Sequence, residues 1–187
     1  MQKYKILIIT PQWRCSDNRV TNVVNQYFEM LKNKEQFETE VIHLVMKFSF
    51  LENILRIILH PFLELYNGVL PPWVNKPCNT NHINYLKTKK GFSNLALKLN
   101  SHINEISPNK IIMHWMDPSI NIIKQLELNE IEKTLVVHEI DPLLILNRYN
   151  IKTKIFENFD NILVRNYKQK ETLTTLNIKS EILRSAI

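Results

Sequence analysis

The first quarter of the chain alternates between two hydrophobic patterns. Residues 5–10 form a continuous apolar run that ends at Pro11, which is typical of a strand buried on both faces of a parallel sheet. Apolar residues then recur at helical spacing from Val20 to Leu31, and residues 40–45 return to strand character. Residues 5–45 therefore predict a strand–helix–strand unit.

The same rhythm continues in the second half of the chain. The apolar spacing predicts helices at about 92–103, 118–127, within 143–156, and at about 168–176. Between them, short apolar runs predict strands at 110–113, 134–137, 161–164 and 181–184. Strands that alternate with helices predict an α/β fold with a Rossmann-like, doubly wound and mostly parallel sheet. We expect this sheet to form a single domain over residues 1–187.

Residues 46–91 interrupt the rhythm and are predicted to be a helical and loop insertion. Their most apolar part, 48–59, is well short of the roughly 20 residues needed to cross a bilayer. Two interpretations remain for residues 47–66. The segment is either a helix in a membrane interface, with Lys47, Arg56 and His60 near anionic head groups, or an amphipathic helix folded onto its own sheet. The polar run 75–91 is predicted to be a surface loop.

Charge and cysteine content narrow the function classes. A formal net charge of +6 and a sequence pI near 9.3 favour an acidic partner. The cations are dispersed and no nucleic-acid motif is visible, which disfavours nucleic acid. Cys15 and Cys78 lie far apart without metal-ligand spacing, so neither a metal site nor a disulfide framework is expected. A cytoplasmic location fits best, with docking on the inner face of the plasma membrane as an addition if residues 47–66 contact lipid.

Polar residues follow several of the predicted strands. Parallel α/β sheets bind ligands beyond the carboxyl ends of their strands. His114, His138 and Arg165 stand at three such ends, and the loop 12–18 follows the first strand. These positions mark the candidate site.

Four stretches resemble one known family when they are taken in order. They are "KILIITPQW", "NKIIMHW", "KTLVVHEIDP" and "FDNILVRNYKQKETLTTLNIKSEILRSAI". In this order and spacing they resemble the N-terminal, acceptor-side domain of GT-B-fold glycosyltransferases, of the retaining group 1 or family-four class. The resemblance covers residues 1–45 and about 90–187. It implies transfer of a sugar from a nucleotide donor to a hydroxyl in bacterial surface-polysaccharide synthesis, with no obligatory metal or other cofactor.

Several departures from the family pattern accompany the resemblance. The usual glycine pair after the first strand is missing, because the only glycines of the chain are Gly68 and Gly91. Arg165 stands where the family has a serine, and Ser185-Ala186 replaces its "NG". A nucleotide-sugar-binding domain would follow the last strand, but this sequence ends at Ile187. The resemblance therefore implies an acceptor-binding half that needs a partner chain with the donor domain, or a truncated remnant.

The resemblance also suggests roles for single residues. His138 matches a family histidine at the cleft and would orient or polarise substrate hydroxyls, whereas its structural alternative is a strand-end histidine bonded to a backbone carbonyl. Trp115 could stack on a sugar or complete the core. Glu139 and Asp141 could bind acceptor hydroxyls or cap the next helix, and capping is favoured for Asp141, which precedes Pro142. The remaining cleft-lining candidates are Gln12, Trp13, Arg14, Asn18, Arg19, His114 and Arg165.

These residues leave several functions open. First-loop cations near a helix N-terminus could meet phosphate, although solvated surface charge explains them equally well. No serine or cysteine nucleophile motif supports hydrolase chemistry. The leading hypothesis is a transferase half with a glycan or glycolipid acceptor. The alternatives are a non-catalytic Rossmann-like binding or scaffold subunit that pairs with another chain, and a different nucleotide-binding domain of the same fold.

Overall fold

The computed structural model describes residues 3–11, 29, 31, 33–47, 82–138 and 142–183. Its strands form one seven-stranded sheet with the order β3-β2-β1-β4-β5-β6-β7, and every neighbouring pair is parallel. The strands are β1 (Tyr4–Pro11), β2 (Phe37–Lys47), β3 (His82–Leu86), β4 (Lys110–His114), β5 (Glu132–Val137), β6 (Asn161–Val164) and β7 (Glu181–Ile182). This confirms the predicted Rossmann-like α/β fold.

The central strand is buried on both faces. Ile6, Leu7, Ile8 and Ile9 are at most 3% exposed, as expected for the apolar run that predicted β1. Ile6 and Ile8 pack in one apolar cluster, whereas Leu7 and Ile9 pack in another, because successive side chains of a strand point to opposite faces. The sheet is therefore the middle layer between two apolar clusters.

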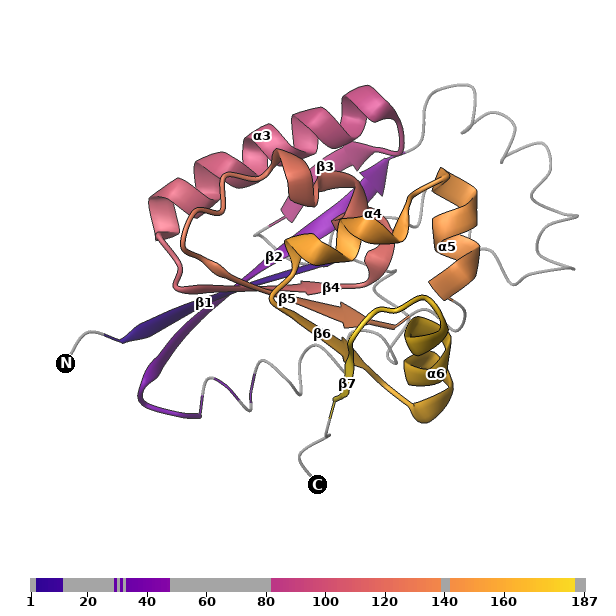
Figure 1. Ribbon diagram of the computed structural model, residues 1–187. Helices are drawn as coiled ribbons and strands as arrows, with labels where there is room; N and C mark the ends of the chain where they lie inside the picture. Colours follow the sequence, from indigo (N-terminus) through magenta and orange to yellow (C-terminus); the bar gives the residue numbers. More distant parts are fainter. Residues whose placement is uncertain are drawn as a thin grey trace, which may run out of the picture.

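Four helices cover one face of the sheet (Figure 1). They are α3 (Lys89–Ile106), α4 (Met116–Ile122), α5 (Pro142–Tyr149) and α6 (Tyr167–Thr175), with 3₁₀ turns η2 (Ile123–Gln125) and η3 (Thr153–Asn158). The chain moves across the sheet in one direction from β3 to β7, so right-handed crossovers place all of these helices on one side. The helix predicted from Val20 to Leu31 lies outside the described residues, except for Glu29 and Leu31, which are both helical.

One sequence-based prediction is wrong. Residues 82–86 of the expected surface loop form β3, an edge strand parallel to β2 with His43 opposite His82. Ile83 and Tyr85 are buried and alternate with more exposed neighbours, which is the period of a half-buried strand. The surrounding asparagines and lysines hid this short alternation. Residues 48–81 lie outside the described residues, so the insertion and its proposed lipid contact stay predictions. Among the helices that the structure describes, none is long and apolar enough to cross a membrane.

Candidate functional site

The sheet brings the carboxyl ends of its strands to one edge. β1 lies between β2 and β4, so the chain leaves β1 toward one side and later returns to build the sheet on the other. In open α/β sheets such a switch in strand order creates the crevice where ligands bind. His114 ends β4, His138 follows β5, and Arg165 follows β6. Of the other candidates, Gln12, Trp13, Arg14, Asn18, Arg19 and Glu139 lie outside the described residues.

His114 and His138 form a hydrogen-bonded pair at this edge. His114 Nδ1 lies 2.9 Å from His138 Nε2, and the two rings are nearly parallel with centroids 5.1 Å apart. Strand pairing explains the meeting, because His114 stands opposite Val136 in the β4–β5 register and His138 follows two residues later. Since two unprotonated nitrogens repel, one ring donates its N–H and the other accepts it. The pair therefore fixes complementary tautomers on the two rings.

Trp115 covers one face of the His138 ring. The two ring centroids are 3.9 Å apart and the planes differ by 20°. Trp115 has a positive φ of 69°, and its backbone N–H donates to the Val136 carbonyl at 2.8 Å. This turn directs the indole away from the helix-covered face. On the opposite face the indole packs against the cluster that contains Ile6 and Ile8. The indole thus holds the His138 ring in place while it completes the core on that side.

Burial keeps both imidazoles neutral near pH 7. His114 is fully buried and His138 is 7% exposed. Burial lowers the pKa of His114 to about 4. The pKa of His138 is lowered to about 3, first by burial and then by the charges of His114 and Arg165. The pair can therefore donate and accept hydrogen bonds at neutral pH without carrying a charge.

Arg165 stands at the start of α6. Its side chain is exposed, and its backbone N–H donates to Gln169 Oε1 at 2.7 Å. Asn166 caps the helix, because its side-chain oxygen accepts the Gln169 N–H at 2.9 Å. These two bonds fix the backbone from which Arg165 projects. The site thus combines a neutral histidine pair with a cation close enough to influence it.

A second polar pair at this edge was missed from the sequence. Lys87, in the turn after β3, forms an ion pair with Asp117 at 2.5 Å. Burial and then Asp117 raise the pKa of Tyr85, which therefore stays protonated.

The sequence also held a signal for the site as a whole. The chain contains the pattern His-x-x-Asp-Pro twice, at 114–118 and at 138–142. The first copy begins at the last residue of β4 and the second directly follows β5; these strands are neighbours, which is why the two histidines meet.

The described residues contain no group of three or more histidine, cysteine, aspartate or glutamate side chains that could hold a metal ion. The polar atoms brought together are two imidazoles and a guanidinium. Such groups suit hydroxyl and anionic ligands, which hydrogen-bond to neutral imidazole and to guanidinium.

Comparison with known proteins identifies solved structures with a similar fold. No family model matches the chain, and no curated protein matches its sequence. Solved structures of similar fold include a Listeria monocytogenes protein named as a candidate UDP-N-acetylglucosamine 2-epimerase (TM-score 0.60, 14% identity, covering 96% of this chain and 43% of that one). Another is the UDP-GlcNAc 2-epimerase from Neisseria meningitidis bound to UDP-GlcNAc (TM-score 0.57, 11% identity, covering 96% of this chain and 45% of that one). A third is a glycosyltransferase from Rickettsia africae (TM-score 0.52, 14% identity, covering 97% of this chain and 42% of that one).

These similarities concern the fold. The chain spans less than half the length of each of these three proteins, and the low identities carry no residue-level correspondence. The chain therefore has the GT-B-like Rossmann fold found in sugar-nucleotide epimerases and glycosyltransferases.

Proposed function

We propose that this chain is the acceptor-binding half of a retaining, nucleotide-sugar-dependent glycosyltransferase of bacterial surface-polysaccharide synthesis. The observation that carries the proposal is the neutral His114–His138 pair at the carboxyl edge of a GT-B-like sheet. A neutral imidazole can accept a hydrogen bond from a hydroxyl or donate one to it, as acceptor binding requires. The donor would be a nucleotide sugar held by a second domain outside residues 1–187, which a partner chain would supply.

Within this proposal the residues have distinct roles. His138 orients the acceptor hydroxyl, and His114 fixes the tautomer of His138 through their 2.9 Å hydrogen bond. Trp115 holds the imidazole by stacking on it. Arg165, with its exposed cation near His138, attracts the phosphate groups of the donor or of a glycolipid acceptor. The chain would work in the cytoplasm, and residues 47–66 would dock it on the inner face of the plasma membrane.

Calorimetric titration with a panel of nucleotide sugars tests this assignment. The chain would be titrated alone and together with the product of any adjacent reading frame. We expect binding only with the partner, because the donor site would lie in the second domain. Tight binding by this chain alone would overturn the acceptor-half assignment. The absence of binding in both mixtures would favour the alternative, a non-catalytic Rossmann-like subunit or a remnant.

A second candidate follows from the structural comparisons. The solved structures of similar fold include UDP-GlcNAc 2-epimerases, which act on the nucleotide sugar itself. An assembled epimerase would convert UDP-GlcNAc without any acceptor, whereas a transferase would leave it unchanged until an acceptor is supplied. Chromatography of the nucleotide sugar after incubation with and without an acceptor mixture separates the two candidates.

Flotation with vesicles tests the membrane contact separately. We expect the chain to float with vesicles of phosphatidylcholine and phosphatidylserine at low salt, and less at physiological salt, because salt screens the attraction to anionic head groups. If the chain stays unbound at both salt concentrations, residues 47–66 do not dock on lipid.

A further inference from the structure

A groove lies between the edge strand β3 and helix α3, away from the histidine pair. It encloses about 440 Å³, and its lining includes Leu86 of β3, Leu97 of α3, and the lysines Lys47 and Lys98. In Figure 1, α3 runs beside β3 at one end of the sheet. The lining places the groove between the last residues of β3 and the N-terminal half of α3, beside the end of β2.

Two leucines of this groove face solvent. Leu86 is 43% exposed and Leu97 is 69% exposed. Covering an aliphatic side chain contributes roughly 25 cal/mol for each Å² removed from water. Neighbouring exposed apolar side chains with a polar rim are typical of interaction sites. A ligand that covers both leucines would gain this energy.

The charged side chains of the groove are all cationic. Its lining contains Lys47 and Lys98 and no described acidic residue. The sequence has no aspartate or glutamate from residue 82 to 104. Lys89 and Lys90 are exposed in the first turn of α3, where the helix dipole adds positive potential. A partner with carboxylates would thus be attracted, and a cationic partner would be repelled.

The backbone of the edge strand β3 offers hydrogen-bonding groups beside the groove. β3 is one of the two edge strands of the described sheet, and it pairs with β2 on one side. The other side of an edge strand presents backbone N–H and C=O groups that can pair with an added strand. The lysines of the groove lie beside this edge, Lys47 at the end of β2 and Lys98 on α3, and would repel a cationic segment. They would favour a segment that brings its own negative charge.

We propose that this groove binds an extended acidic polypeptide segment, which adds to β3 as a further strand. The five residues of β3 match a segment of similar length, whose alternate side chains would cover Leu86 and Leu97. Its carboxylates would face Lys47 and Lys98. A second copy of the chain fits less well because it would bring the same lysines. A bilayer fits less well because a flat surface does not fill a groove.

Fluorescence anisotropy with a labelled peptide tests this proposal. The probe is a peptide of about seven residues that alternates glutamate and valine, long enough to span the strand. We expect saturable binding that weakens as salt rises. Lys98→Glu should lower the affinity roughly tenfold, because it replaces an attraction by a repulsion. Leu97→Asp should also weaken binding, by removing the apolar contact and adding a like charge.

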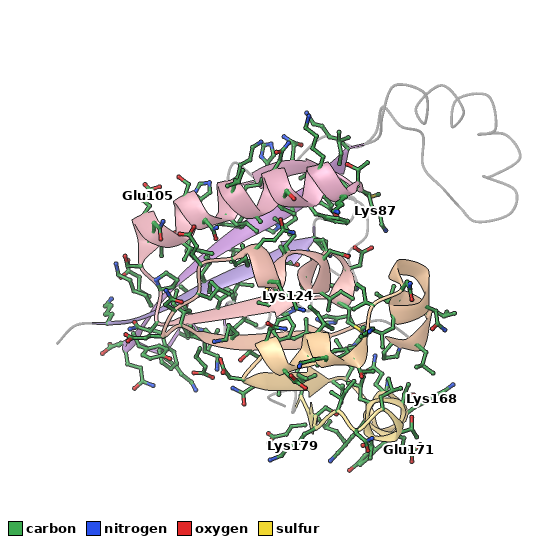
Figure 2. The ribbon with its side chains drawn as sticks, turned by 45° about the horizontal axis from the view of Figure 1, so that its top comes forward. Lys87, Glu105, Lys124, Lys168, Glu171 and Lys179 are labelled. Carbon is green, nitrogen blue, oxygen red and sulfur yellow. The ribbon has the colours of Figure 1, made fainter. Side chains whose placement is uncertain are left out.

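Matched controls separate strand addition from simple charge attraction. Lys168→Glu makes the same charge change on α6, far from the groove (Figure 2), and should leave the affinity nearly unchanged. A peptide methylated on alternate backbone nitrogens keeps its charge but cannot donate the strand hydrogen bonds, so it should bind poorly. Circular dichroism of each variant confirms that the fold is intact.

Several outcomes would overturn the proposal. Equal binding of the methylated peptide, or equal losses in the Lys98→Glu and Lys168→Glu variants, would show non-specific charge attraction. Self-association abolished by Leu97→Asp would identify a second copy as the occupant. Binding to phosphatidylserine vesicles that depends on Lys98, without peptide binding, would identify a bilayer. The absence of any binding would leave the groove as an ordinary protected edge. None of these outcomes depends on the proposed transferase function.

Discussion

At the ends of β4 and β5, two histidines share one hydrogen bond in a place that water hardly reaches. A proton added to either ring would put a charge in that buried place, and on His138 this charge would also be repelled by Arg165. In the unfolded chain the histidines are exposed to water, and they titrate near pH 6.5. Proton uptake therefore favours unfolding over a defined pH range.

We expect the free energy of unfolding to decrease as the pH falls from about 6.5 toward 4. In this range the histidines of the unfolded chain bind protons. The folded pair stays unprotonated, because its pKa values are about 4 and 3. Each histidine can contribute up to about 1.4 kcal/mol per pH unit. Urea unfolding at several pH values measures the slope.

A double variant isolates the contribution of the pair. His114→Gln with His138→Gln should flatten the slope. A residual slope should remain, because burial and then the charge of His82 also lower the pKa of His43. Below about pH 4 the Asp160 carboxylate adds to the loss, since its interactions with Lys133 hold its pKa low. An unchanged slope in the double variant would mean that the pair accepts protons as freely as the unfolded chain does.

At the scale of elements, the junction of β3 and α3 depends on one glycine. Thr88 caps α3, because its hydroxyl oxygen accepts the Gly91 N–H at 3.0 Å. The cap brings Gly91 so close to β3 that a Cβ there would lie 2.0 Å from the Leu86 carbonyl oxygen. Backbone at both positions would have to move to accept any side chain. The glycine is therefore required by the close approach of helix and strand.

We expect Gly91→Ala to destabilise the protein by roughly 1–3 kcal/mol, since the clash with backbone outweighs the better helix propensity of alanine. Thermal or urea unfolding measures the loss. Ser101→Ala, an exposed position on the same helix, is the matched control and should change stability by less than about 0.5 kcal/mol. Comparable stabilities of the two variants would show that β3 and α3 can separate at little cost.

At the scale of the whole molecule, burial decreases from the middle of the sheet to its edges. β1, β4 and β5 carry fully buried side chains, whereas β7 has two residues that are not fully buried. Local opening exposes the backbone most easily where few side chains are packed. The sheet should therefore be most stable at its centre.

Hydrogen exchange followed by mass spectrometry should show this gradient. We expect peptides from β1 and β4 to exchange slowest, and those from β3 and β7 to exchange first. An acidic peptide bound in the groove should slow exchange in β3 and leave β7 unchanged. Uniform exchange across the sheet would instead indicate that the protein opens only by global unfolding.

The sequence alone determined the order of most elements. The continuous apolar runs of β1, β4, β5 and β6 and the helical spacing of α3 encode local structure directly, because burial on two faces or on one stripe imposes a period on the chain. The same reasoning predicted that His114, His138 and Arg165 end strands. It missed β3, where five alternating residues stand in a polar context.

Only the tertiary structure decided which of these ends meet. His114 and His138 are 24 residues apart, and the parallel pairing of β4 with β5 brings their nitrogens to 2.9 Å. Strand order and register are set by long-range packing, which no local period encodes. The low pKa values of the pair, the ion pair between Lys87 and Asp117, and the open groove beside β3 follow from that same packing.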